Sequence, residues 1–198
     1  MITTAPPTPA LDALTAAARA AASGKGLPPV ERWNPDYCGE IDMRIAADGT
    51  WYYAGTPIGR PALVRLFSTI LRKDPDRFVL VTPVERVGIT VEDAPFLAVE
   101  MSVDGEGEAR RIGFRTNVDD VVTVDADHEL RFEREATDGL RPYVRVRGGL
   151  WARVTRSVFY DLVALGEERV IDGRARFGVA SAGAFFAMAD ADEIAGLT

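Results

Sequence analysis

Histidine and cysteine are almost absent, because the 198 residues contain only His128 and Cys38. A single histidine excludes histidine-based catalytic triads and metal sites with two histidine ligands. No G-x-S-x-G motif precedes a predicted helix. A single cysteine excludes an intramolecular disulfide and a thiolate metal cluster, and fits a reducing cytoplasm. We therefore expect no serine or zinc hydrolase chemistry of the usual kind and no cofactor.

Long apolar runs and an excess of basic residues are also missing. No apolar run approaches the roughly 18 to 20 residues that cross a bilayer. The net charge of −7 argues against a general electrostatic grip on nucleic-acid polymers or anionic membranes, but leaves a local basic patch open. Near the N-terminus, Asp12 and Arg19 interrupt an alanine-rich segment that no basic region precedes, so we reject a signal peptide. We expect a cytoplasmic protein and leave its oligomeric state open.

The composition is that of a globular protein, with 47% apolar and 27% charged residues, and the length allows one large or two small domains. Residues 1–10 are expected to be frayed and residues 11–22 to form a helix. We assign residues 1–36 to this helix and an extended connector, 37–84 to an N-terminal α+β repeat, and 85–198 to a C-terminal domain.

One stretch, residues 49–71, combines a strand, a turn and an amphipathic helix. Residues 51–53 are aromatic and suit a strand, which Gly and Pro residues then break. Pro61 opens the helix, and Asp74-Pro75 ends it. Apolar residues on one helical face predict burial against a sheet. They are Leu63, Leu66, Phe67, Ile70 and Leu71.

A weaker copy of this unit follows 96 positions later, with Val154-Thr155-Arg156 matching Ile58-Gly59-Arg60. Asp138-Gly139 likewise echoes Asp48-Gly49, at a slightly different spacing. If the copies are real rather than chance similarity, Arg60 and Arg156 occupy equivalent places in two superimposable halves.

The rest of the chain is rich in strand patterns. Alternating apolar residues predict a half-buried strand at 41–45, and 78–81 suits another. Seven further strands, a helix at 156–165 and a last strand at 170–179 before an Ala- and Gly-rich tail complete the prediction. The seven are 87–91, 96–103, 111–116, 121–124, 130–132, 143–146 and 150–154.

Six segments carry a family resemblance: TPIGRPALVRLF at 56–67, FVLVTPVERVGI at 78–89, VEDAPFLAVEM at 91–101, FRTNVDD at 114–120, DHELRF at 127–132, and PYVRVRGGLWARVTRSVFYDLV at 142–163. They resemble the bacterial domain-of-unknown-function family 1285, over about residues 39–165. The resemblance implies an α+β core made by domain duplication and a C-terminal half similar to pleckstrin-homology-like folds. It also implies a nucleotide-related ligand between the domains in a signalling role, and it brings no enzymatic activity.

An arginine-rich strand is the best anion-binding candidate. Period-two spacing places Arg141, Tyr143, Arg145 and Arg147 on one face, with the intervening valines toward the core. Guanidinium groups match phosphate oxygens, and a tyrosine ring can stack on a base. A solvated face paired with Glu133 and Glu135 is the alternative.

Polar loops supply the other candidates. Thr116, Asn117 and Asp120 lie at a strand end, where an Asx-type turn is the alternative to ligand binding. His128 is either a turn residue or a hydrogen-bond donor to a ligand. The acidic residues between 119 and 129 have no EF-hand spacing, so we predict no metal site and leave cation binding by this segment open.

The leading hypothesis is a non-enzymatic protein that binds a small anionic, nucleotide-like molecule at the interface of its two domains. Arg147 and Thr116 would meet Glu85 or Arg86, which lie on the crossing between the halves, and Arg147 would anchor the anion. A protein-interaction module with an exposed strand edge or groove is the alternative. A third hypothesis is an enzyme that uses Glu85, Asp120 and Arg147.

Overall fold

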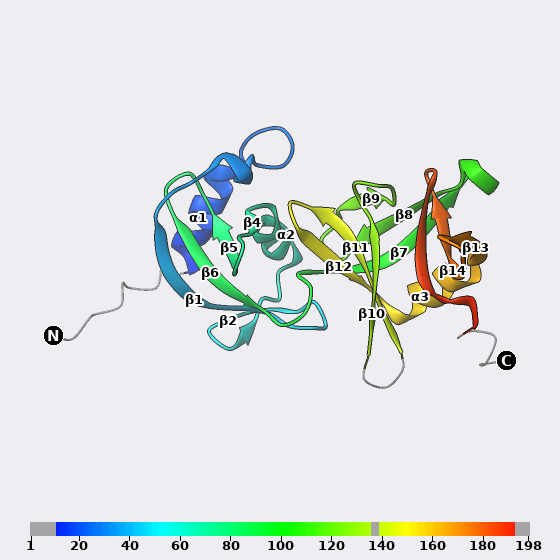
Figure 1. Ribbon diagram of the computed structural model, residues 1–198. Coiled ribbons are helices and arrows are strands. Elements are labelled where there is room, and N and C mark those ends of the chain that lie inside the picture. Colours follow the sequence, from blue (N-terminus) through cyan, green and yellow to red (C-terminus); the bar gives the residue numbers. More distant parts are fainter. Residues whose placement is uncertain (1–10, 136–138, 193–198) are drawn as a thin grey trace. The chain divides into compact units, whose positions relative to one another are not determined.

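The computed structural model describes residues 11–135 and 139–192, and its class is α+β, as expected. Residues 1–10, expected to be frayed, and Asp138 of the second copy lie outside the described residues. The chain divides into two compact units, one of residues 1–95 with 148–150 and the other of residues 96–147 with 151–198 (Figure 1). Each unit contains a curled six-stranded sheet.

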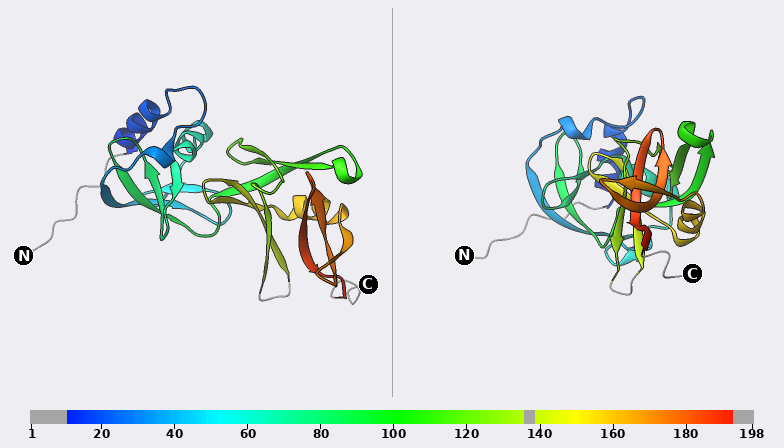
Figure 2. Two further views of the ribbon diagram at one scale, coloured as in Figure 1. Left: turned by 45° about the horizontal axis from the view of Figure 1, so that its top comes forward. Right: turned by 45° about the vertical axis from the view of Figure 1, so that its right-hand side comes forward.

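The first unit combines one mixed sheet with two α-helices. Its elements are α1 (Leu11–Ala21), η1 (Val30–Arg32), β1 (Tyr37–Ile45), β2 (Trp51–Tyr53), β3 (Thr56–Pro57), α2 (Pro61–Thr69), β4 (Leu71–Lys73), β5 (Phe78–Val81) and β6 (Arg86–Val91). The strand order is β3-β2-β1-β6-β5-β4, with β1 and β6 parallel and the other pairs antiparallel. Helices α1 and α2 contact each other on one side of this sheet (Figure 2, left).

The core of this unit follows the predicted alternation in β1, where Ile41, Met43 and Ile45 are buried. In α2 the buried apolar side chains are Leu63 and Phe67. The prediction that Leu66 is buried is wrong, because Leu66 lies at the margin of the apolar face and keeps part of its surface exposed.

The second unit contains a six-stranded sheet, a helix and a small antiparallel sheet. Its elements are β7 (Phe96–Asp104), η2 (Gly107–Ala109), β8 (Arg111–Thr116), β9 (Val121–Thr123), β10 (Leu130–Arg134), β11 (Leu140–Arg147), β12 (Leu150–Val154), α3 (Arg156–Ala164), β13 (Glu167–Ile171), β14 (Arg174–Ser181) and β15 (Ala184–Asp190). The larger sheet has the order β10-β11-β12-β7-β8-β9, with β12 and β7 parallel. The small sheet has the order β13-β14-β15.

Ser181 ties the small sheet to the larger one. Its Oγ accepts a hydrogen bond from the Ile112 backbone N–H at 2.9 Å and donates one to the Val124 carbonyl at 2.7 Å. The side chain is buried, so both backbone groups find their partners away from water.

The two six-stranded sheets share one topology. When the strands of each are numbered in chain order, both sheets read 4-5-6-1-2-3, and strands 1 and 6 form the parallel pair. Strands β1 and β7, the first in each, are both nine residues long and begin 59 positions apart (96 − 37 = 59).

The strand-turn-helix duplication read from the sequence is wrong in its register. Helix α2 lies between the third and fourth strands of its sheet, whereas α3 follows the sixth strand. Arg60 is the N-cap of α2, but Arg156 is the first helical residue of α3. Because a Gly- or Pro-rich break followed by an apolar stripe is a general helix start, the two helices gave a false alignment.

Two further expectations differ from the structure. The strand predicted at 170–179 is a hairpin, since Asp172 and Gly173 have positive φ values of 50° and 76° and separate β13 from β14. The Ala- and Gly-rich segment after it contains β15. In addition, β6, assigned from the sequence to the C-terminal domain, pairs with β1 and β5 of the first unit.

Candidate functional site

The residues predicted as a polar loop, Thr116, Asn117 and Asp120, form and stabilise the turn between β8 and β9. Thr116 is fully buried, and its Oγ1 accepts hydrogen bonds from the backbone N–H groups of Val118 at 3.3 Å and Asp120 at 3.0 Å. The Asn117 side-chain oxygen accepts one from Leu97 N–H at 3.0 Å. Thr116 and Asn117 therefore have structural partners already.

Arg147 reaches the same turn, where its guanidinium pairs with the Asp120 carboxylate and lies 5.1 Å from the Phe96 ring centroid. The arginine-rich strand thus meets the polar loop. In the structure the resulting contacts are internal to the second unit.

Tyr143 and Arg145 have other surroundings. Tyr143 is 2% exposed, and the Arg131 guanidinium lies 5.0 Å from its ring centroid and 4.5 Å from that of Trp151. Since a guanidinium covers this buried ring, Tyr143 is poorly placed to stack on a base. Arg145 is half-buried, and its backbone N–H donates to the Glu129 carbonyl at 3.0 Å.

His128 belongs to a tight turn built on Asp125. The Asp125 carboxylate accepts hydrogen bonds from the backbone N–H groups of Asp127 and His128, and lies 3.1 Å from His128 Nδ1. The backbone hydrogen bond from His128 is the main reason that the pKa of Asp125 is lowered. No cluster of three potential metal ligands occurs in the part of the chain that the structure describes.

Glu85 and Arg86 belong to the first unit, and the other predicted site residues to the second. Arg86 donates to Asp74 at 3.1 Å, and Asp74 also accepts from the buried Arg72 at 2.7 Å. The Glu85 backbone N–H donates to Thr82 Oγ1 at 3.2 Å.

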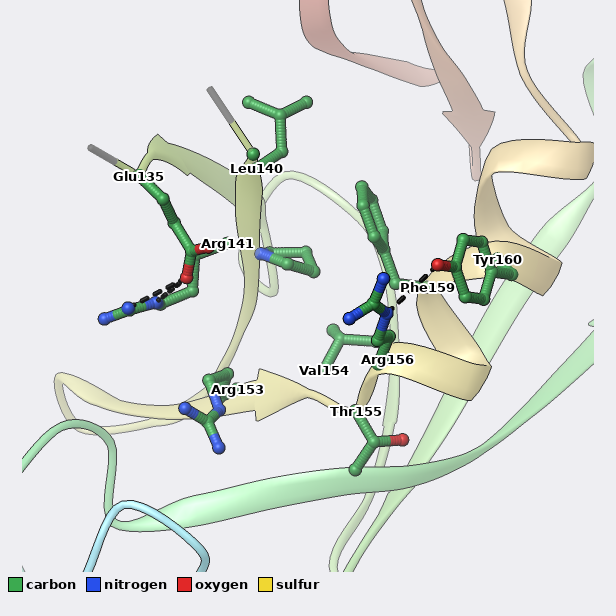
Figure 3. A pocket seen from close by; sticks show the side chains of 11 residues that line it. Glu135, Leu140, Arg141, Arg153, Val154, Thr155, Arg156, Phe159 and Tyr160 are labelled. Atoms are coloured by element: carbon green, nitrogen blue, oxygen red, sulfur yellow. Dashed lines mark hydrogen bonds and ion pairs between the residues drawn. The ribbon is translucent and has the colours of Figure 1, made fainter. Parts of the chain in front are cut away.

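A different set of residues lines a cavity of about 610 Å³ within the second unit (Figure 3). They come from the facing ends of β10 and β11, the end of β12 and the first turns of α3. The lining residues are Glu135, Gly139, Leu140, Arg141, Pro142, Arg153, Val154, Thr155, Arg156, Phe159 and Tyr160. None of the nine site residues predicted from the sequence is among them, although Arg141 belongs to the predicted arginine-rich face.

Three guanidinium groups and one carboxylate give the pocket its charge. Arg141 Nε donates to Glu135 Oε1 at 2.9 Å, and Nη2 forms an ion pair with the same oxygen at 2.8 Å. Arg156 Nε donates to the Tyr160 hydroxyl at 3.0 Å, and this hydrogen bond raises the pKa of the arginine. Arg153 adds a third cation. The formal charge of the lining is therefore positive in a protein of net charge −7.

The first turn of α3 adds polar groups to the same wall. Thr155 is the N-cap, but its hydroxyl makes no capping hydrogen bond. The first backbone N–H groups of a helix have no acceptor within the helix, and they carry a partial positive charge that favours anions. Thr155 and Arg156 lie at this end.

Apolar groups form the rest of the wall. Phe159 packs against Phe132, with ring centroids 6.4 Å apart and a tilt of 40°. Pro142 is buried, and Tyr160 is 59% exposed beside Arg156. The pocket thus offers cationic groups beside aromatic and aliphatic surface.

In the sequence analysis Thr155 and Arg156 served only to align the repeat, and Arg153 was not considered. An available signal was the segment ARVTR, in which a strand delivers two arginines and a threonine directly to the start of a helix.

Comparison with known families gives two adjacent matches. Residues 28–94 match the model described as "Domain of unknown function (DUF1285), N-terminal domain", and residues 95–188 match "Protein of unknown function (DUF1285), C-terminal domain". The chain belongs to the DUF1285 family. The two DUF1285 models meet between β6 and β7, at the division between the two compact units.

Solved DUF1285 structures agree with this assignment. A DUF1285 family protein from Silicibacter pomeroyi DSS-3 is 47% identical, with a TM-score of 0.85 over 96% of this chain and 100% of that one. A DUF1285 family protein from Shewanella baltica OS155 is 27% identical, with a TM-score of 0.50 over 63% of this chain and 91% of that one. The search of curated proteins gave no significant match.

Proposed function

We propose that this DUF1285 protein is a non-enzymatic binding protein whose ligand is a small anion with a planar, nucleotide-like body. The observation that carries the proposal is the pocket of about 610 Å³ in the second unit, which combines three arginines with aromatic side chains. Its volume falls within the roughly 300 to 1,000 Å³ typical of small-molecule sites.

The charge of the pocket supports an anionic ligand. Arg141 pairs with Glu135, and Arg153 and Arg156 bring two further guanidinium groups to the pocket beside the start of α3. Guanidinium forks bind phosphate or carboxylate oxygens in pairs, and a helix N-terminus favours the same charge. The anionic group would therefore lie at the α3 side of the pocket.

The walls support a planar body. The rings of Phe159 and Tyr160 lie on one wall of the pocket (Figure 3). Pro142 also lines the pocket. Flat apolar rings bury well against such groups, and an aromatic ring beside arginines is suited to a base.

The lining argues against catalysis of the usual kinds. The eleven lining residues include no histidine, cysteine or serine, and their one carboxylate is bound to Arg141. A nucleophile with an adjacent base is therefore not assembled there. Binding is the simpler role.

Three finer properties belong to this proposal. A pleckstrin-homology-like character of the second unit is supported by its curled sheet with α3 after the sixth strand. A cytoplasmic location is supported by the cysteine content. A role in signal transduction would follow from reversible binding of a nucleotide-like ligand.

Isothermal titration calorimetry with nucleoside mono-, di- and triphosphates tests the proposal. We expect Arg153→Gln and Arg156→Gln each to weaken the best binder tenfold or more, because a charge-assisted hydrogen bond contributes about 1.5 to 3 kcal/mol. Arg115→Gln is the matched control, since Arg115 lies on β8 in the same unit, pairs with Glu100 and does not line the pocket.

The variant Arg147→Ala distinguishes between two possible anion sites, the pocket and the surroundings of Arg147. If the pocket binds the anion, this variant keeps its affinity. A tenfold loss of affinity in Arg147→Ala, with unchanged affinity in the Arg153→Gln and Arg156→Gln variants, would show that the anion binds at Arg147 and not in the pocket. Failure of every nucleotide to bind the wild type would overturn the proposal.

A further inference from the structure

We infer that Glu135 makes the pocket select ligands that carry a hydrogen-bond donor at the end opposite their anionic group. This inference rests on the proposed function. Figure 3 shows Glu135 and Arg141 across the pocket from Arg156 and Tyr160, so the acidic and the more basic groups lie on facing sides.

The two oxygens of the Glu135 carboxylate differ in what they contact. Oε1 accepts a hydrogen bond from Arg141 Nε at 2.9 Å and lies 2.8 Å from Arg141 Nη2 in an ion pair. Oε2 accepts no hydrogen bond from any residue in the ranges 11–135 and 139–192. Half of the acceptor capacity of this carboxylate therefore remains for a ligand.

Gly139 keeps the second oxygen accessible. A Cβ atom at this position would lie 3.2 Å from Oε2, and any larger side chain would crowd it further. The Gly139 carbonyl accepts a hydrogen bond from the Glu135 backbone N–H at 2.8 Å, which fixes the two residues beside each other. The geometry thus presents a carboxylate oxygen on the pocket wall.

A carboxylate on this wall has a clear chemical consequence. An ionised carboxylate only accepts hydrogen bonds and repels a second anion, so it disfavours phosphate or acceptor atoms beside it. An N–H group at that end of the ligand would satisfy Oε2. The Glu135 side chain is 38% exposed, so a ligand donor would replace water at Oε2, and the preference over analogues that lack the donor should be moderate.

Purine nucleoside monophosphates form a matched series for the test. Guanosine 5′-monophosphate has two kinds of N–H donor on the edge of its six-membered ring, inosine 5′-monophosphate has one, and purine riboside 5′-monophosphate has none. The phosphate, the ribose and the ring system are the same in all three. Affinities would be measured by calorimetry with the full-length wild type and Glu135→Gln.

We expect the wild type to bind guanosine 5′-monophosphate at least fivefold more tightly than purine riboside 5′-monophosphate. In Glu135→Gln this preference should fall below twofold, because the guanine nucleotide weakens while the donor-free analogue stays the same or binds more tightly. Glu133→Gln is the control, since Glu133 lies on β10, pairs with Arg131 at 3.0 Å and does not line the pocket. It should keep the wild-type preference.

Two results would overturn the inference while leaving the proposed function intact. One is equal binding of all three nucleotides by the wild type. The other is tighter binding of guanosine 5′-monophosphate by Glu135→Gln, which would make Glu135 only the counter-ion of Arg141. Absence of binding of all three to the wild type would overturn this inference, and the proposed function would fall with it only if no other nucleoside mono-, di- or triphosphate bound either.

Discussion

Phe67 joins α2 to the sheet of the first unit. Its side chain is fully buried, and its ring stacks on Trp51 with centroids 6.5 Å apart and an interplanar angle of 21°. Leu66, one position earlier, is only half-buried. Neighbouring residues of a helix point in directions about 100° apart, so one can fill the core while the next lies at its margin.

This difference predicts unequal costs for truncation. Phe67→Ala should lower the free energy of unfolding by about 3 to 5 kcal/mol, because it removes the ring and leaves a cavity. Leu66→Ala should cost less than half as much. Urea denaturation of the two variants measures both values. Similar losses would mean that Leu66 carries as much core packing as Phe67.

Single site residues were harder to predict than core residues. The sequence placed Thr116 at a strand end and Arg147 on the face of an arginine-rich strand. It did not indicate that Asp120 pairs with Arg147 or that Arg131 covers Tyr143, because these partners come from separate strands. A side chain can be assigned to a ligand only when its internal partners are known.

Among the elements, the helices and most strands follow local rules. Helix α3 was expected at 156–165 and spans Arg156–Ala164, and the seven strands predicted between 87 and 154 all form. Alternating burial and Gly- or Pro-containing breaks identify such elements locally. The β13–β14 hairpin was missed, because residues 170–179 were read as one strand across Asp172-Gly173, a dipeptide typical of type I′ turns.

Two exposed glycines give a matched test of that hairpin. Gly173 has a φ of 76° and Gly59 does not have a positive φ, yet a Cβ atom would meet no neighbour within 4 Å at either position. Gly173→Ala should therefore lower stability by about 1 kcal/mol through backbone strain alone. Gly59→Ala should leave stability unchanged or raise it by about 0.4 to 1 kcal/mol.

Thermal and urea denaturation of both variants would measure these changes. Equal effects at the two positions would show that the turn at 172–173 adopts a conformation that alanine accepts. The hairpin assignment would then need revision.

For the whole molecule, the shared strand order is the feature that local patterns could not supply. The parallel pairs β1–β6 and β7–β12 join the first and last strands of each sheet, and such pairing is set by long-range packing. The sequence therefore suggested a duplication, but the two copies were matched through their helices and not through their strands.

In the described ranges, no helix is long and apolar enough to cross a membrane.

The pocket depends on the same long-range arrangement. Glu135 and Arg141 belong to neighbouring strand ends, while Arg153 and Arg156 lie more than ten residues later in the chain. The fold gathers arginines from separate elements into one wall of an acidic protein. The composition alone left a local basic patch possible but gave no indication of its position.

Chemical-shift mapping by NMR tests the central claim most directly. A ¹H–¹⁵N spectrum of the full chain would be recorded with increasing guanosine 5′-monophosphate, and the amide shifts followed residue by residue. We predict that the largest changes occur at residues 139–142 and 153–160, around the pocket, and that amides of residues 116–120 stay nearly unchanged. Changes confined to residues 116–120 and Arg147, or no changes at saturating nucleotide, would contradict the account.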